Sequence, residues 1–289
     1  MNFERWRVAL SSALQANAAA AAMVNPGRWT VRPFGSERDV LIEHVDGWLM
    51  FHASEKGSAE VRDTALLDLL TSNARLPGNI KHALCGAGLR PASRAELPLI
   101  DDTPIAERLK AVLDSFAASF GGGRRDEMPS SSNVSLSEIE ELCVAAGWRV
   151  SGRDDDSVRI PLEIPCAFAP AEMRATPRGL KAAAVVAAAD AATPLGAQAR
   201  ALLLLRAAAA IRWVRPAALE DGKVVFEVFL GSEPLVDEIG HGFAALSVAL
   251  RLCAAETQVL GGDERIAHAY LQRAAAEARL AHDIRAGGV

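Results

Sequence analysis

The sequence lacks the short motifs that usually identify a catalytic or metal-binding protein. No two of its four cysteines lie within four residues of each other, so no zinc or redox spacing exists; they are Cys85, Cys143, Cys166 and Cys253. Each lies in an apolar segment, which is typical of buried free thiols in a reducing compartment. No nucleophile, phosphate-binding or dinucleotide motif is present. We therefore expect no enzymatic activity, no cofactor and no metal.

The chain also lacks a basic surface and a long uncharged apolar run. It carries 31 basic and 36 acidic residues, a formal net charge of −5, and its arginines are scattered. Nucleic-acid binding requires clustered cations, so we expect none. The most apolar stretch, 180–205, is interrupted by Lys181, Asp190 and Pro194, which argues against a membrane span. Residues 1–24 are alanine-rich, but Glu4 and Arg7 favour an amphipathic helix over a signal peptide. A cytoplasmic location is the expectation.

The informative features of the chain are its length, its high apolar content and a stretch that occurs twice. Its 289 residues, half of them hydrophobic, suggest two domains at about 150 residues each. Residues 97–120 and 227–250 share one pattern, in which a strand end is followed by a polar turn with one proline and an amphipathic helix. Pro234 lies 130 residues after Pro104. At that offset the apolar positions of the two predicted helices coincide.

The first half predicts a helix, three strands, a helix, two strands and a helix. Apolar spacing places helices at 2–24, 59–72 and 104–120, with Thr103 as the cap of the last. Strands are expected at 29–34, 40–45, 48–53, 80–84 and 89–100, with Asp46-Gly47 as a hairpin turn. Residues 121–133, rich in glycine and serine, predict a linker between domains 1–120 and 134–289.

The second half predicts the same order with two additions. Ser135 and Glu138 indicate a capping box that begins a helix ending near Gly147. Strands are expected at 148–151, 158–164, 211–214 and 223–230, and helices at 196–210, 234–260 and 264–284. Residues 180–189 fit either a strand or a helix. Residues 166–178 have no counterpart in the first half and form an expected insertion, and the helix at 264–284 is also extra.

This order resembles a known family. In the first half the similar residues are Leu66-Leu67-Asp68-Leu69-Leu70 followed by Leu76-Pro77-Gly78, then Leu97-Pro98-Leu99 and Thr103-Pro104. In the second half they are Leu202 to Leu205 and the helix from Pro234. The order, with these residues, is similar to that of class I type III secretion chaperones and the YbjN-like proteins. The resemblance covers most of the chain, once in each half.

The resemblance implies an α+β fold of two tandem chaperone-like domains, each helix–three antiparallel strands–helix–two strands–helix, that form an intramolecular pseudo-dimer. It also implies a non-enzymatic protein that binds an extended segment of a client protein through apolar grooves and strand edges, without nucleotide. The chain would then act as a monomer, with protein or peptide as its partner and neither nucleic acid nor membrane.

The five tryptophans are the candidate binding residues: Trp6, Trp29, Trp48, Trp148 and Trp213. Aromatic anchors often dominate the energy of protein interfaces, but each of these also lies in an apolar element where core packing accounts for it.

Three polar clusters carry weaker hypotheses. Asp237 and His241 share a helix face, which favours structural pairing over catalysis. His52, Ser54 and Glu55 have the residue types of a triad without its geometry. Asp154 to Asp156 predict a hairpin turn, since a calcium loop would need a glycine and a distal glutamate.

Two alternatives to the chaperone-like function follow from these observations. The chain could be a regulatory or structural interaction module whose halves stabilise each other. It could instead be an enzyme with a site between the halves, which would require histidines and carboxylates to converge in a polar pocket.

Overall fold

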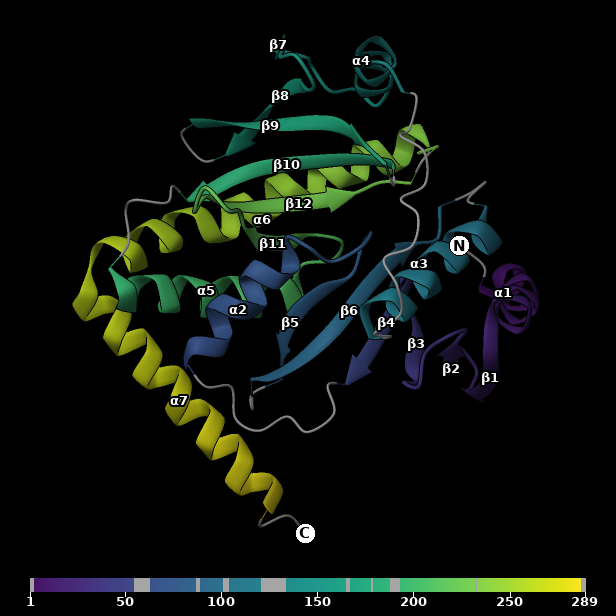
Figure 1. The fold of residues 1–289 in the computed structure, drawn as a ribbon, viewed down its shortest axis with the longest axis horizontal. Coiled ribbons are helices and arrows are strands. Elements are labelled where there is room, and N and C mark those ends of the chain that lie inside the picture. Colours follow the sequence, from purple (N-terminus) through teal and green to yellow (C-terminus); the bar gives the residue numbers. More distant parts are fainter. Residues whose placement is uncertain are drawn as a thin grey trace.

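The computed structural model shows an α+β fold with two antiparallel six-stranded sheets (Figure 1). It describes residues 3–54, 63–86, 89–100, 104–120, 134–164, 167–177, 179–187, 193–231 and 233–286. The expected linker 121–133, the cap Thr103, Glu55 and Cys166 lie outside the described residues.

The elements of the first half form a helix, four strands, a helix, two strands and a helix. They are α1 (Phe3–Asn17), β1 (Ala18–Asn25), β2 (Arg28–Pro33), β3 (Val40–Val45), β4 (Trp48–Ser54), α2 (Asp63–Asn73), β5 (Lys81–Cys85), β6 (Arg90–Pro98) and α3 (Ile105–Phe120). The sheet order is β1-β2-β3-β4-β6-β5.

The second half repeats that order and adds one helix. Its elements are α4 (Leu136–Ala145), β7 (Gly152–Arg153), β8 (Val158–Ile164), β9 (Ala167–Thr176), β10 (Gly179–Ala187), α5 (Pro194–Ala210), β11 (Arg215–Ala218), β12 (Val224–Phe229), α6 (Val236–Gly262) and α7 (Glu264–Ala286). The strands lie in the order β7-β8-β9-β10-β12-β11, which is the order of the first sheet. Corresponding elements begin 127 to 134 residues apart, so the offset found at Pro104 and Pro234 extends over the whole chain.

Each half has four strands before its second helix, so the prediction of three is wrong. In the first half the predicted helix 2–24 ends at Asn17, and residues 18–25 form β1. Alanine favours helix, but β1 pairs with β2 across a turn at Gly27, whose φ of +81° suits glycine. Tertiary pairing therefore overrides the local propensity.

In the second half the missing strand is the predicted insertion. Residues 167–176 form β9, which pairs with β8 on one side and β10 on the other. The prediction of an insertion at 166–178 is therefore wrong. The segment 180–189, for which strand and helix were both left open, contributes to strand β10 (Gly179–Ala187). Because β8 corresponds to β2, Trp148, which precedes β7, is not the counterpart of Trp29 on β2.

Two short predicted strands are also displaced. Residues 148–151 and 211–214 are irregular, and the strands begin just after them as β7 and β11. Trp213 has a φ of +67°, a left-handed conformation that a strand cannot accommodate.

Local signals elsewhere are confirmed. Asp46 and Gly47 both have positive φ, +50° and +76°, as a tight β3–β4 hairpin requires. The Ser135 hydroxyl accepts a hydrogen bond from the Glu138 amide at 3.2 Å, and the Glu138 carboxylate accepts one from the Ser135 amide at 2.6 Å. This is the predicted capping box.

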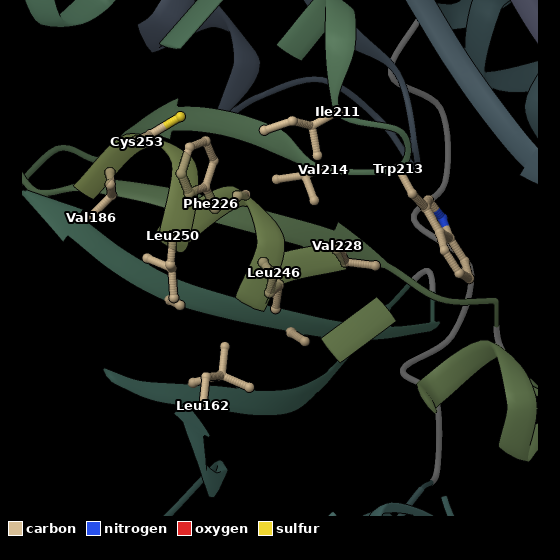
Figure 2. Close-up of a cluster of buried hydrophobic side chains, with 14 of the residues drawn as sticks. Leu162, Val186, Ile211, Trp213, Val214, Phe226, Val228, Leu246, Leu250 and Cys253 are labelled. Atoms are coloured by element: carbon tan, nitrogen blue, oxygen red, sulfur yellow. The ribbon is translucent and has the colours of Figure 1, made fainter. Parts of the chain in front are cut away.

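Each sheet buries one face under its own helices. In the first half α1 and α3 cover the sheet, and the Phe51 and Phe116 rings lie 6.3 Å apart in that core. In the second half α6 packs on β8, β10 and β12, with Phe226, Leu246 and Leu250 among the buried side chains (Figure 2). Among the described helices α6 is the one long and apolar enough to cross a membrane by length and composition, a property that a core helix shares.

Candidate functional site

The five candidate tryptophans divide into two groups. Trp29 on β2 is 2% exposed in the core of the first half, and Trp148 is half-buried against Phe243, with ring centroids 5.3 Å apart. Trp6, Trp48 and Trp213 lie where the two halves meet. The structure therefore brings three of the five together and leaves two in ordinary packing positions.

A groove of about 680 Å³ lies at this meeting point. Its walls come from α1, the β3–β4 hairpin, the end of β6 and α6, and the residues that line it are Trp6, His44, Asp46, Gly47, Trp48, Pro98, Leu99, Ile100 and His241. We call it the inter-half groove. A hollow of about 310 Å³ between α4 and α6 shares His241 with it. The two hollows thus meet at one side chain, which suits an extended occupant better than a compact one.

The second half holds Trp48 in place. The Trp213 ring meets the Trp48 ring edge-on, with centroids 5.7 Å apart and planes at 74°. The guanidinium of Arg212 lies over the Trp48 ring at 5.7 Å and forms an ion pair with Asp46 at 3.4 Å. Figure 2 shows Trp213 at one end of the buried cluster, with its ring directed away from Cys253. The left-handed backbone of Trp213 is what allows this contact across the halves.

The polar groups of the groove are few. Burial lowers the pKa of His44, and the Asp46 carboxylate opposes that shift. His241 contacts the main-chain carbonyl of Asp237 through Nδ1 at 2.7 Å, which corrects the predicted pairing with the Asp237 side chain. Trp6 is 7% exposed, and its Nε1 has no hydrogen-bond partner among the described residues. It is therefore a buried donor that the described residues leave unsatisfied.

The halves contact each other through corresponding elements. Helix α2 of the first half packs on β11 of the second, α5 of the second half packs on β5 of the first, and α2 and α5 pack together (Figure 1). Since α2 corresponds to α5 and β5 to β11, the contacts are reciprocal.

A buried cation at the start of β5 and of β11 follows the same reciprocity. Lys81, 1% exposed, donates to the carbonyls of Ile211 and Val214 at 2.8 and 3.1 Å. Arg215, 3% exposed, donates to three carbonyls of the first half, Leu76, Gly78 and Ile80, at 2.9–3.1 Å. In each half, a buried cationic side chain thus donates hydrogen bonds to main-chain carbonyls of the other half.

Each cation also has a buried glutamate in its own half. Lys81 lies 3.0 Å from Glu96, and Arg215 lies 2.8 Å from Glu227, which also pairs with Lys181 at 2.7 Å. Burial lowers the pKa of Lys81, partly offset by Glu96. Burial alone would raise the pKa of Glu227, but Arg215 and Lys181 outweigh it and hold that pKa below its ordinary value. The Glu96 carboxylate further accepts from the Trp213 amide at 3.2 Å.

Sequence reasoning missed these four charged residues. A signal was available, because Glu227 interrupts the apolar run of β12 and Lys81 is a charged residue at the start of the short strand β5. A charge inside an apolar strand is almost never buried unless it is paired. The partners could not be identified from the sequence, because the carbonyls of Ile211 and Val214 lie more than 100 residues from Lys81 along the chain.

The weaker polar hypotheses find no catalytic geometry. His52 lies 3.8 Å from Glu43, and burial, aided by the charges of Arg94, Arg28 and Lys81, lowers its pKa to about 4. The 154–156 segment is the predicted turn, where the Asp154 amide donates to the Ser157 carbonyl at 2.9 Å. Over the described ranges no three His, Cys, Asp or Glu side chains gather as metal ligands do.

A further hollow of about 440 Å³ lies between α5, α6 and α7, lined by Arg206, Leu252, Glu256, Tyr270 and Glu277 among others. One of its walls is α7, the helix that the second half has in addition. Comparisons with protein-family models, curated proteins and solved structures find no match to this chain.

Proposed function

We propose that this chain is a non-enzymatic binding protein that holds an extended, mainly apolar segment of a client protein in the inter-half groove. The observation that carries the proposal is the groove wall, where Trp6 and Trp48 from separate elements face a single cavity between the halves. Aromatic anchors in such positions supply most of the binding energy of protein interfaces. The type III secretion chaperone-like resemblance points to the same class of ligand.

The groove is suited to a main chain as well as to side chains. His44, Asp46 and His241 line the groove and give its walls polar groups. A peptide brings a main-chain N–H and C=O at every residue, so it can meet such groups wherever its register places them. The occupant in this proposal is therefore an extended peptide, not a compact metabolite.

We also propose that the two halves act as an intramolecular pseudo-dimer. Reciprocal packing of α2 on β11 and α5 on β5 supports this arrangement, because an isologous interface repeats each contact in both directions. Arg212 and Trp213 of one half support Trp48 of the other, so the groove depends on both. The buried free thiols Cys143 and Cys253 are consistent with a reducing, cytoplasmic location.

The test is recovery of a partner from the native host, followed by a matched pair of variants. The full chain should co-purify with a stoichiometric protein partner. Trp48→Ala should weaken that complex by roughly 30-fold or more, the loss expected for an interface anchor worth about 2 kcal/mol. Trp148→Ala removes a half-buried tryptophan outside the groove and should leave the affinity unchanged.

Two results would contradict the proposal. If the chain is always recovered alone and no peptide library binds, it has no client. If a partner binds and Trp48→Ala and Trp148→Ala behave alike, with circular dichroism showing both folded, the regulatory or structural module is favoured. A reproducible turnover that depends on His44 or His241 would instead favour the enzyme.

A further inference from the structure

The two sheets differ in how well their outermost strands are protected against pairing with another strand. The first sheet ends in β5, which faces α5 of the second half, and in β1, whose one strand partner among the described residues is β2. The outer backbone edge of β1 therefore has N–H and C=O groups with no strand beside them. In Figure 1, β1 lies at the far side of the molecule from α7.

The side chains of β1 do nothing to block this edge. The strand is eight residues long, Ala-Ala-Ala-Ala-Ala-Met-Val-Asn, and contains no charge, proline or glycine. Met23 and Val24 are 48% and 55% exposed. Natural edge strands are usually short, charged or interrupted by proline, because an open edge recruits another strand.

The corresponding edge of the second sheet shows the usual protection. Strand β7 is two residues long and is followed directly by Asp154, Asp155 and Asp156. The same position in the same topology is thus closed in one half and open in the other. The difference lies in the residues themselves and not in the fold.

We infer that β1 pairs antiparallel with β1 of a second copy of this chain, across a two-fold axis near Ala21. Pairing about a two-fold axis at Ala21 places Ala21 against its own copy and Ala20 against Ala22 of the other copy, so charges of one sign at these positions would face each other. A run of five alanines meets this condition, since it carries no charge and no bulky group to clash at the axis. An unrelated partner strand would impose no such requirement.

The apolar side chains at the two ends of β1 support the same occupant. Met23 and Val24 lie at one end of the strand, and Phe34, 57% exposed, follows Pro33, which pairs with Ala18 at the other end. Antiparallel pairing about Ala21 brings the Met23 end of one copy toward the Phe34 end of the other. Both ends of the interface then cover apolar surface that is exposed in the single chain.

The dimer would join the two first sheets into one continuous sheet and remove the open edge. This departs from the monomer that the tandem resemblance implies. The sequence also predicted a helix for residues 18–24, and a helix has no strand edge to pair. The inference goes beyond the proposed function, and β1 supplies no residue to the inter-half groove. Client binding and dimer formation can therefore fail separately.

The experiment measures the mass of the full chain in solution by light scattering and sedimentation over a wide concentration range. The native chain should give twice its 30.6 kDa. Ala20→Lys with Ala22→Lys, both exposed positions, should give a single chain, and so should the matching pair of aspartate substitutions. Mixing the lysine and aspartate variants should restore the double mass, because opposite charges then face each other.

Ala255→Lys, on the exposed face of α6, is the control for added charge and should not change the mass. A native chain that stays single at the highest concentration overturns the inference, as does a lysine variant that remains double. A native chain that stays single while an alanine-rich peptide binds β1 assigns the edge to a peptide and equally overturns the second copy. Circular dichroism of each variant confirms that loss of mass is not loss of fold.

Discussion

Removing the Lys81 ammonium should destabilise the protein far more than its single charge would suggest. Lys81→Met keeps the length of the side chain, so packing changes cost little, below about 1.5 kcal/mol. The variant leaves the carbonyls of Ile211 and Val214 without their donor and leaves the buried Glu96 carboxylate with the Arg94 guanidinium at 3.9 Å as its nearest cation. Breaking one partner of a buried pair in this way costs about 3–5 kcal/mol.

The measurement is thermal unfolding followed by circular dichroism. At about 2 °C per kcal/mol for a chain of this size, the midpoint should fall by roughly 6–10 °C. The double variant Lys81→Met, Glu96→Gln removes the unpaired charge and keeps an acceptor for the Trp213 amide, so it should recover about half of the loss. Lys110→Met, an exposed lysine paired with Asp114, is the control and should stay within about 0.5 kcal/mol of the native chain.

Two outcomes would refute this reasoning. A Lys81→Met variant within about 1 kcal/mol of the native chain would mean that the buried cation is not needed to hold the halves together. A double variant whose loss equals the sum of the Lys81→Met and Glu96→Gln losses would mean that Glu96 acts independently of Lys81, because coupled partners give a double loss smaller than the sum.

Three further predictions concern pH, thiols and the capping box. The pKa of His52 is about 4 in the folded chain against 6.5 in the unfolded chain, so between those values the unfolded state binds more protons. Stability should therefore decrease as the pH is lowered from 6.5 to 4, by about 1–2 kcal/mol once the opposing Glu43 charge is allowed for, and pH-dependent unfolding of His52→Gln should lack this loss. Burial raises the pKa of Cys143 to about 12 and of Cys253 to about 11, so a thiol reagent should modify both only after unfolding, as mass spectrometry of the labelled peptides would report. Ser135→Ala should lower the unfolding free energy by about 1 kcal/mol in urea titrations, through loss of the α4 cap.

The sequence predicted well those features that depend on neighbouring residues. The capping box at Ser135, the hairpin at Asp46 and the helices that follow Pro104 and Pro234 each rest on chemistry within a few positions. The duplicated order was also visible, because an apolar pattern survives in both copies. The predictions of an α+β fold and of a two-part organisation rested on these features.

The sequence failed where a distant strand decides the local structure. Residues 18–25 have the composition of a helix, and residues 167–176 look like an irregular insertion. Both are strands because each finds a pairing partner, β2 in one case and β8 and β10 in the other. No window along the chain contains that information.

The arrangement of the candidate site could not be predicted from the sequence. Only the fold, which places α1, the β3–β4 hairpin and α6 side by side, separates Trp48 in the groove wall from Trp29 in the core. The hydrogen bonds of Lys81 and Arg215 across the halves could not be predicted for the same reason, since their carbonyl partners lie in the opposite half.

The shared core between the halves has a consequence for biosynthesis. Leu66, Leu70 and Leu84 of the first half are buried within the cluster of the second half, against residues of α5 and β11. During translation these leucines leave the ribosome long before α5 and β11 are synthesised. They therefore remain exposed to solvent while more than 100 further residues are added. Exposed apolar surface on a nascent chain promotes aggregation and is bound by chaperones. Slow elongation over residues 120–210 should therefore lower the yield of native protein more than slow elongation elsewhere in the chain.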